Sequence, residues 1–424
     1  MNLRRSARAL YDQVRNDTFD FLAAEPVRPL RRKLLQAIGK PPLLLGIFEE
    51  SADESYVIAG PAGSTTIKPV PVGAVPQPRE SAFAPVRAHI IPHALTSPYV
   101  SGVIRGSCLL LPSQLIRDRS RIRTHGGPLF HFEKGHALAR QRSSIEIPEG
   151  ILVGGAGAFN WYHFIVECLP KALLASRLPQ GFASLPLLVP MECRTIPSFS
   201  DALGLFSESR RIIYLAPDQI AHVGRLVVFD DVSVGPFNLT QGSWPIVDDY
   251  SQHDDFMKEY FHEFRSRLLD EAGEREPTKR FYLARPRLRR NYNQDELMDI
   301  AGRFGFVPLG LEGLTLAEQA RHLSEAEALV GPSGAAWTGL AFCPAGVRGI
   351  SWLPKEYEQF SSYASLAHLL GHRLHFLTVA TERPLRSSAD AYEQSYALNT
   401  IQFEDALWRV MGDLSAMDAI RRPS

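Results

Sequence analysis

The stretch Ala328-Leu-Val-Gly-Pro-Ser-Gly-Ala-Ala-Trp-Thr-Gly-Leu-Ala-Phe342 joins an apolar run to a helix-like run of small residues through the turn Gly331–Gly334. A strand that enters a helix through glycine and serine leaves backbone N–H groups unpaired at the start of the helix. These donors and the helix dipole together favour an anion such as a phosphate. The local pattern fits a purely structural strand-to-helix turn equally well, so the flanking sequence has to distinguish the two.

On both sides of this turn, short apolar runs alternate with helical patterns. The runs predict strands at residues 281–284, 306–309, 328–330, 347–353 and 374–379, with helices at 294–304, 315–326 and 360–370 between them. Such alternation predicts a parallel, doubly wound sheet, in which ligands bind at the carboxyl ends of the strands. The turn Gly331–Gly334 falls at such an end, which favours the anion-binding interpretation.

The rest of the chain divides into further parts. Short apolar runs predict partly antiparallel strands from 82 to 151, and α/β alternation follows, with a glycine-rich turn at 154–159 and a helix at 161–178. A charged linker at 270–279 ends this part. We therefore expect a helical and irregular N-terminal extension (1–80), an N-terminal α/β domain (81–275), a C-terminal Rossmann-like domain (276–385) and a C-terminal helical segment (386–424).

Composition narrows the class of protein. The 424 residues include 46 basic and 46 acidic side chains, so no net charge points to a nucleic-acid partner. The four cysteines lack zinc-ligand spacing, and neither a secretory signal nor an apolar run of transmembrane length stands out. We expect a cytoplasmic protein. Peripheral binding of the arginine-rich residues 1–40 to the inner membrane face is an alternative to a solvated helix there.

His163 and Glu167 stand one helical turn apart in the helix that follows the glycine-rich turn. A carboxylate one turn from an imidazole can fix the tautomer of the ring and raise its basicity, which suits a general base. The alternative interpretation is a hydrogen bond on the helix surface or a histidine of the core.

A run of arginines follows the strand 281–284, and comprises Arg285, Arg287, Arg289 and Arg290, with Asn291 after them. At the carboxyl end of a parallel strand, guanidinium groups can bind a diphosphate bidentately. A solvated loop is the alternative. The chain has no Asp-x-Asp and no Walker A motif, so we expect phosphate to be neutralised by arginine and a helix start, without a metal ion.

Glu318 and Gln319 lie in the helix that precedes the opening turn. A carboxylate near a nucleotide site can accept the hydroxyl groups of a ribose. Equally, Thr315 and Glu318 have the spacing of a capping box, which would give the carboxylate a structural role.

Taken in order, these residues resemble glycosyltransferase family 61, in its bacterial capsular polysaccharide type, over roughly residues 95–380. The resemblance is carried by Asn160 to His163, Glu167, Leu169-Pro170, Arg285, Arg290-Asn291, Gly305-Phe306, Leu314-Thr315, Glu318-Gln319, Ala326, Val330 to Ala336, Thr338 and Phe342. It implies a GT-B architecture, with two Rossmann-like domains facing a cleft. It also implies inverting, metal-independent transfer of a sugar from a nucleotide sugar, typically a UDP-sugar, to a hydroxyl of a surface polysaccharide or glycan precursor.

The resemblance also implies roles for individual residues. His163 or Glu167, singly or as a pair, would be the catalytic base, and Asn160, Trp161 and Tyr162 would lie on the acceptor side. The donor would be bound by Arg285, Arg289, Arg290, Asn291, Glu318, Gln319, Gly331, Ser333, Gly334, Ala335 and Ala336. The expected partners are the nucleotide-sugar donor and a glycan or lipid-linked acceptor, with no cofactor and no metal ion.

Two positions depart from the family pattern. Ser333 stands where the family commonly has histidine, and Gly339 stands where it commonly has asparagine. The alternative function is therefore a catalytically silent protein of the same fold that binds a nucleotide sugar or a glycan.

Overall fold

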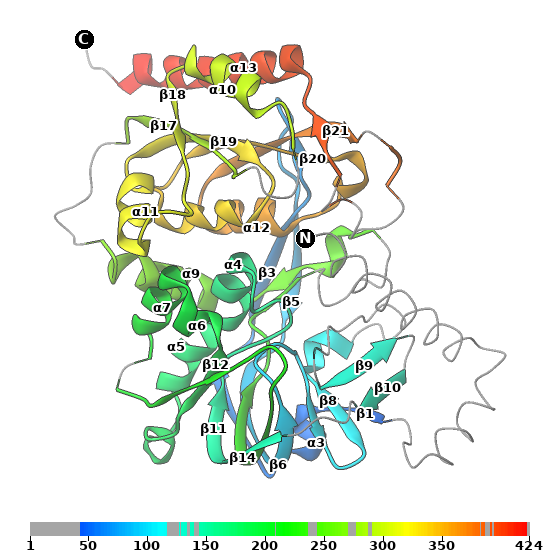
Figure 1. Cartoon of the computed structure of the whole chain (residues 1–424). Coiled ribbons are helices and arrows are strands. Elements are labelled where there is room, and N and C mark those ends of the chain that lie inside the picture. Colours follow the sequence, from blue (N-terminus) through cyan, green and yellow to red (C-terminus); the bar gives the residue numbers. More distant parts are fainter. Residues whose placement is uncertain are drawn as a thin grey trace.

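The computed structural model shows a mixed α/β protein built around two large sheets (Figure 1). It describes residues 43–116, 127, 129–133, 136–139, 144–207, 209–235, 244–269, 277–286, 291–381, 383–385, 391 and 394–421. The predicted helix within residues 1–40 and the arginines Arg287, Arg289 and Arg290 lie outside these ranges.

The second sheet confirms the predicted parallel arrangement. Its strands are β17 (Lys279–Leu283), β18 (Phe306–Leu309), β19 (Ala326–Pro332), β20 (Arg348–Pro354) and β21 (Arg373–Thr381), in the order β18-β17-β19-β20-β21. All four pairings between them are parallel, and β22 (Tyr396–Ala397) adds an antiparallel edge. After β17 the chain forms β18 on one side of that strand, and it then returns to form β19 on the other side. The strand order therefore reverses between β17 and β19. Such a switch point is where open α/β sheets bind ligands.

Helices cover both faces of this sheet. On one face lie α11 (Leu316–Leu323), the 3₁₀ helix η7 (Ala335–Phe342) and α12 (Ser362–Leu369), and on the other lie α10 (Gln294–Gly302) and α13 (Thr400–Arg421). Strand residues alternate between the two cores. For example, Phe281 and Leu329 pack with the first group, whereas Tyr282 and Val330 pack with the second. Burial on both faces explains the apolar runs in the central strands, at residues 281–283 of β17, 328–330 of β19 and 349–354 of β20.

The first sheet combines antiparallel and parallel strands. It contains β1 (Leu44–Ile47), β2 (Glu54–Ala59), β6 (Val86–Thr96), β7 (Val103–Arg105), β8 (Cys108–Leu111), β11 (Ser144–Leu152), β12 (Leu187–Pro190), β13 (Ile212–Leu215) and β14 (Ile220–Phe229). The strands β14-β11-β12-β13 are parallel neighbours, and β6 joins β14 antiparallel. Smaller elements are α3 (Phe48–Ser51), η2 (Ser113–Ile116) and the pairs β9 (Phe130–Glu133) with β10 (His136–Ala139) and β15 (Ser233–Val234) with β16 (Ser251–Gln252).

This sheet also has a switch point, between β11 and β14. From β11 the chain runs through β12 and β13 on one side, and then returns to the other side as β14. The connection after β11 contains α4 (Trp161–His163), the π-helical turn η3 (Phe164–Cys168), α5 (Pro170–Ser176) and η4 (Gln180–Phe182). The connection after β12 contains α6 (Glu192–Thr195) and α7 (Pro197–Gly204). Pro170 is the first residue of α5, as its missing N–H allows.

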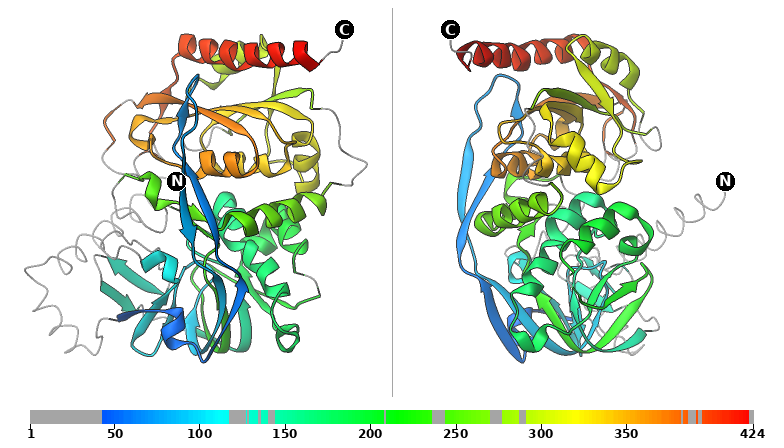
Figure 2. Two further views of the ribbon diagram at one scale, coloured as in Figure 1. Left: turned by 180° about the vertical axis from the view of Figure 1, so that it is seen from behind. Right: turned by 90° about the vertical axis from the view of Figure 1, so that its left-hand side faces the viewer.

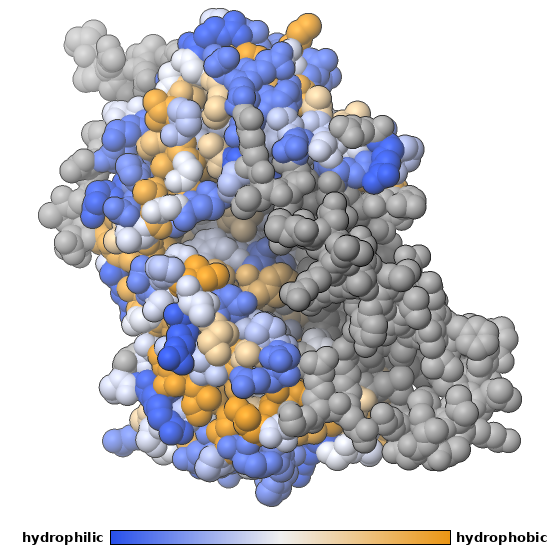
Figure 3. Space-filling view, viewed as in Figure 1, coloured by the Kyte–Doolittle hydropathy of each residue, from blue (hydrophilic) through white to orange (hydrophobic). Residues whose placement is uncertain are grey.

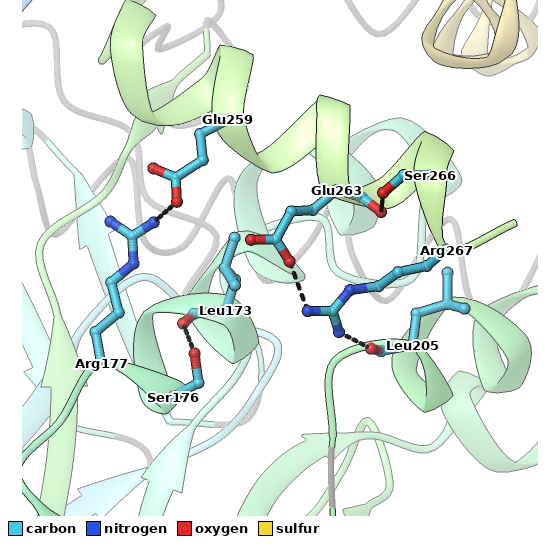
Figure 4. A network of polar contacts seen from close by, with 8 residues as sticks. All are labelled: Leu173, Ser176, Arg177, Leu205, Glu259, Glu263, Ser266 and Arg267. Atoms are coloured by element: carbon cyan, nitrogen blue, oxygen red, sulfur yellow. Dashed lines mark hydrogen bonds and ion pairs between the residues drawn. The ribbon is translucent and has the colours of Figure 1, made fainter. Parts of the chain in front are cut away.

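We call the part of the molecule built on the first sheet the first half and the part built on the second sheet the second half. The helix α9 (Asp254–Ser266) is attached to the helices of the first half by charged side chains (Figure 4). Arg177 pairs with Glu259, and Arg267 pairs with Glu263 and donates to the Leu205 carbonyl. The apolar face of α9 is buried, and Phe264 packs on Phe342 of η7 at a centroid distance of 5.2 Å. Therefore α9 contacts both halves.

A long hairpin also runs along both halves (Figure 2). It is formed by β3 (Ala62–Ile67) and β5 (Pro78–Phe83), and β4 (Val70–Pro71) near its tip adds to β21 of the second sheet. Ile67 N donates to Ser365 Oγ of α12, and Gln252 N donates to Ser64 Oγ. Together with β1 and β2, this hairpin gives residues 44–83 several strands, in the stretch for which the sequence predicts irregular structure with short strands.

The two halves share one continuous hydrophobic core. The cluster includes Phe164 and Leu169 from the first half and Trp337, Leu340 and Leu366 from the second. The short helices η5 (Val247–Asp249) and η8 (Lys355–Tyr357) lie close to this boundary, where Ser361 Oγ donates to the Val247 carbonyl. Among the described residues, no helix is both long and apolar enough to cross a membrane.

Candidate active site

His163 and Glu167 form a hydrogen-bonded pair at the start of the helical segment after β11. His163 Nδ1 lies 2.9 Å from Glu167 Oε1. A carboxylate can only accept, so Nδ1 carries the hydrogen and Nε2 is the basic nitrogen of the neutral ring. The His163 side chain keeps 15% of its surface exposed, whereas Glu167 keeps 5%. The pair therefore has a buried carboxylate that orients a more accessible imidazole.

The π-helical turn Phe164–Cys168 follows His163 directly and contains Glu167. In an α-helix, residues four apart drift by about 40° around the axis, because each residue turns by about 100°. A π turn holds more residues per turn and reduces this drift, and such turns are frequent at functional sites. Asn160 caps the segment, and its side-chain oxygen accepts a hydrogen bond of 3.0 Å from Tyr162 N.

Two glycines lie against the pair. Gly157 has a φ of +81°, and a Cβ there would lie 2.9 Å from Cγ and Cδ2 of His163. A Cβ on Gly235 would lie 2.7 Å from Glu167 Oε1. Both distances are too short for a side chain, so backbone alone forms the walls beside the imidazole and the carboxylate.

Lys171 and Asp231 form a second buried pair next to the first. Lys171 Nζ lies 2.8 Å from Asp231 Oδ1 and donates a hydrogen bond of 2.9 Å to the Gly154 carbonyl. Burial disfavours the ammonium charge, but Asp231 outweighs this effect and the pKa of Lys171 is raised. Gly154 and Asp231 follow β11 and β14, so the ion pair occupies the switch point of the first sheet.

Sequence reasoning missed this pair. A signal was present, because Lys171 stands one turn after Glu167 and Asp231 is the second residue after an apolar strand. The distance in sequence between the two residues hid their pairing.

Arg285 lies at the switch point of the second sheet, as predicted from its position after a strand. Its Nη2 donates a hydrogen bond of 3.0 Å to the Ser333 carbonyl, and a Cβ on Gly334 would collide with the guanidinium. Gln294 holds the Arg285 backbone, because its side chain accepts from Arg285 N and donates to Arg285 O. The arginine and the opening turn are therefore brought together.

The turn itself is the accessible part of its segment. Gly331 is buried in β19, whereas Ser333, Gly334, Ala335 and Ala336 are half-buried. η7 begins at Ala335, so the predicted helix start is confirmed.

Glu318 and Gln319 have structural partners. Glu318 Oε2 accepts hydrogen bonds of 2.8 Å from both Thr315 N and Thr315 Oγ1, which confirms the predicted capping box. These hydrogen bonds, first the one from the Thr315 backbone, lower the pKa of Glu318. Gln319 Nε2 donates to the carbonyls of Leu311 and Leu314.

Asn291 lies with Arg285 rather than with the opening turn. A surface cavity of about 420 Å³ is lined by Arg285 and residues 291–296. Asn291 is exposed there, and its carbonyl accepts a hydrogen bond from Tyr396 N.

The three residues predicted on the acceptor side differ in exposure. Asn160 is exposed, Trp161 is partly buried against Phe199, and Tyr162 is buried. Burial, and then the nearby Tyr250 and Glu167, raises the pKa of Tyr162 well above its ordinary value. Its ring packs edge-on against Tyr363 of α12 at a centroid distance of 5.1 Å. Tyr162 is therefore a contact between the two halves.

The two parts of the site face one another. α4, with His163, packs against η7, which starts at the turn held by Arg285. In the space-filling view, a hollow lies between the two halves of the molecule (Figure 3). The arrangement brings the helix that carries His163 next to the helix that begins at the opening turn.

Ser333 and Gly339, the two positions at which the sequence departs from the pattern of the family that it resembles, each have a contact that gives them a structural role. Ser333 N donates to the Trp352 carbonyl, and its own carbonyl binds Arg285, so the backbone of this residue holds the turn. A Cβ on Gly339 would lie 2.6 Å from Leu323 Cδ1, so a larger residue there would displace the Leu323 side chain between η7 and α11. In the part of the chain that the structure describes, no three His, Cys, Asp or Glu side chains are grouped so as to hold a metal ion.

Comparison with known proteins adds one result. Residues 161–350 match the family model of glycosyltransferase 61, a range that runs from α4 into β20. It contains His163, Glu167, Arg285 and the opening turn, and it begins one residue after Asn160. No curated protein matches the chain. The match over residues 161–350 supports glycosyltransferase family 61 and points to a glycosyltransferase that binds a sugar donor and an acceptor.

Proposed function

We propose that this chain is an inverting, metal-independent glycosyltransferase that moves a sugar from a UDP-sugar to a hydroxyl of a surface polysaccharide or glycan precursor. One observation carries the proposal. His163, the last residue of α4, pairs with Glu167 of η3. α4 packs against η7, and the turn before η7 is held by Arg285. A base and an anion site on opposite sides of one boundary are what a two-substrate transfer requires.

In this proposal, His163 Nε2 takes the proton of the acceptor hydroxyl as its oxygen attacks the anomeric carbon. The new glycosidic bond forms as the bond from carbon to the diphosphate oxygen breaks, which inverts the configuration. Glu167 holds the ring tautomer and stabilises the imidazolium that forms, since its Oε1 accepts from Nδ1. The proton and the nucleoside diphosphate are the other products.

The donor diphosphate would lie at the turn 333–336. Backbone N–H groups at the start of η7 and the guanidinium of Arg285 would neutralise its charge, as a metal ion does elsewhere. Arg289, Arg290, Asn291, Glu318 and Gln319 remain predicted donor residues. Asn160, which is exposed, and the partly exposed Trp161 would meet the acceptor.

We further propose a GT-B arrangement, in which each sheet is the centre of one domain, and a cytoplasmic enzyme of capsular polysaccharide type. The two switch points support the first statement, because each half has a ligand-binding edge of its own.

The test is UDP release from a panel of UDP-sugars with oligosaccharide and lipid-linked acceptors, followed by determination of the anomeric configuration of the product. We expect transfer with inversion, retained in the presence of a chelator and lost in His163→Ala. Retention of configuration, or unchanged transfer by His163→Ala, would contradict the proposed mechanism.

A catalytically silent binding protein is the second candidate, and Ser333 favours it because a neutral hydroxyl replaces the imidazole that the family commonly has there. Calorimetry separates the two. Binding of a UDP-sugar with no transfer to any acceptor, and no change of the cellular glycan on His163→Ala, would support the silent protein.

A further inference from the structure

Lys171 is a buried cation that the proposed reaction does not use. Only 6% of its side chain is exposed, and its ammonium group binds two separate backbone segments. One is the glycine-rich turn after β11, contacted at the Gly154 carbonyl. The other is the segment after β14, contacted through the Asp231 carboxylate.

The first segment is the wall beside His163. Gly154 begins the turn that leads to Gly157, and the Gly157 backbone lies directly against the imidazole ring. Further hydrogen bonds fix the turn between them, from Gly155 N to the Pro98 carbonyl and from Ala156 N to Ser101 Oγ. The turn ends at Asn160, which caps the helix of the base.

The second segment is the wall beside Glu167. Asp231 begins a short stretch that passes through β15 to Gly235, whose backbone lies against Glu167 Oε1. Asp231 Oδ1 is held by Lys171, while Asp231 Oδ2 is buried without a hydrogen bond. Lys171 therefore holds the start of this stretch, and its next residues are held by the pairing of β15 with β16 and by His253 N, which donates to the Val232 carbonyl.

We propose that Lys171, with Asp231, is a positioning residue for the catalytic base, because one ammonium group ties together the two backbone walls that hold His163 and Glu167. The inference rests on the proposed function for the identity of the base. Lys171 touches neither substrate nor the reacting atoms, and it acts through Gly157 and Gly235.

Stability alone is a weak reason for this pair. A buried ion pair loses the hydration of both charges, and replacing both partners by apolar residues is often neutral or stabilising for a fold. Replacing only one leaves a buried charge without its partner. The informative variant is therefore Lys171→Met/Asp231→Leu, which removes both charges and keeps similar side-chain volume.

The first arm is kinetic. We expect the double variant to stay folded, with kcat reduced about 10- to 100-fold and the KM for the donor little changed, since a small misplacement of a base lowers the rate without weakening the donor site. In the Glu167→Gln background, the same double substitution should reduce kcat no further, because residues that act as one unit are not additive. The positioning role would be overturned if the double substitution reduced kcat in the Glu167→Gln background by as large a factor as in the wild type. An unchanged kcat in the folded double variant would overturn it as well.

The second arm needs no substrate. Hydrogen–deuterium exchange should become faster in residues 154–160 and 230–235 of the double variant. The matched control is Arg348→Met, which also removes a buried cation that donates to a backbone carbonyl, here that of Val410. Arg348 lies at the amino end of β20, whereas Gly154 and Asp231 follow the carboxyl ends of their strands. This control should lose stability and leave exchange in both segments unchanged.

Equal exchange of these segments in the wild-type protein and the double variant would overturn the inference. Absence of sugar transfer by the wild-type protein would instead overturn the proposed function, and the exchange arm would still decide whether Lys171 holds both walls.

Discussion

Arg285 Nη2 and the carbonyl oxygen of Ser333 are 3.0 Å apart, and this hydrogen bond joins the carboxyl end of β17 to that of β19. The two strands are neighbours across the switch point of their sheet. The guanidinium thus fixes the shape of the turn and brings a positive charge to it. Both properties depend on the planar, multiply donating head of arginine.

Arg285→Lys should therefore fail to replace the arginine. We expect the Kd for UDP to rise about 10- to 100-fold in Arg285→Lys and Arg285→Ala alike, as for loss of a hydrogen bond that involves a charged group. Isothermal calorimetry measures this effect. Arg373→Ala, an exposed arginine at the amino end of β21, is the control and should bind UDP normally. A lysine variant that binds like the wild type would show that charge alone suffices.

The Glu167→Gln variant tests whether the tautomer of His163 matters. A glutamine amide can donate to Nδ1 and thereby move the ring hydrogen to Nε2, where the proton of the acceptor has to be received. We expect kcat to fall by about 10²- to 10⁴-fold with the fold retained. Initial rates of UDP release measure the change of kcat, and a thermal melt shows whether the fold is retained. A kcat close to that of the wild type would exclude Glu167 as the partner of the base.

Gly157→Ala tests the wall beside His163. The substitution adds strain at a φ of +81° and places a Cβ against the imidazole, so we expect a loss of both stability and kcat. Gly346→Ala is matched for strain, with a φ of +88°, but a Cβ there meets nothing within 4 Å. It should cost similar stability, measured by urea unfolding, with kcat unchanged. Equal kcat values in the two variants would show that contact with His163 is unimportant.

Glu318→Ala and Thr315→Ala separate capping from donor binding. Both remove the capping box, and Thr315→Ala should cost about 0.5–2 kcal/mol of unfolding free energy. If Glu318 acts only as a cap, neither variant changes the KM for the donor. A rise in KM confined to Glu318→Ala would assign the carboxylate to the donor as well.

His372 predicts a pH dependence of stability. Burial, and secondarily Arg265, lowers its pKa from 6.5 to about 4 against the opposing effect of its hydrogen bond to the Leu340 carbonyl. Below pH 6.5 the unfolded chain binds this proton before the folded one, so stability falls as the pH decreases towards about 4. The total is about 3 kcal/mol, at about 1.4 kcal/mol per pH unit.

Urea midpoints of the wild-type protein and His372→Gln, measured across this pH range, check the prediction. The variant should lose this part of the pH dependence. Parallel curves would show that His372 does not contribute. Since Leu340 lies in η7, the titration also reports on packing next to the candidate donor site.

The second sheet was readable from the sequence because its strands are local signals. Each is a short apolar run bounded by a helix pattern, and burial on both faces makes such runs continuous. Short strands were expected among the prolines and glycines of residues 41–80, but the pairing of β3 with β5 as a hairpin was not predicted. The strands of this hairpin pair with each other, β3 contacts α12, and β4 near the tip pairs with β21. No local sequence pattern encodes these contacts.

In the candidate site, too, contacts between neighbours on one helix were predicted, whereas contacts between distant segments were not. His163 with Glu167, and Thr315 with Glu318, are neighbours on single helices, so their spacing alone predicted both hydrogen bonds. The sequence placed Arg285 and the opening turn each at the carboxyl end of a parallel strand, and the structure shows that the two are in contact. In contrast, Lys171 and Asp231 are 60 positions apart by their numbers, and only the pairing of β11 with β14 brings them together.

By itself, the sequence determined the α/β alternation, the helix start after Pro332, the pairing of His163 with Glu167, and the arginine after β17, because each depends on neighbours within about one turn or one strand end. Only the tertiary structure decided that α4 packs against η7, that Gly157 and Gly235 wall the His163–Glu167 pair, and that Lys171 ties those walls together. These contacts join residues from different strands of the fold, and the burial of apolar surface that creates them is not directional along the chain.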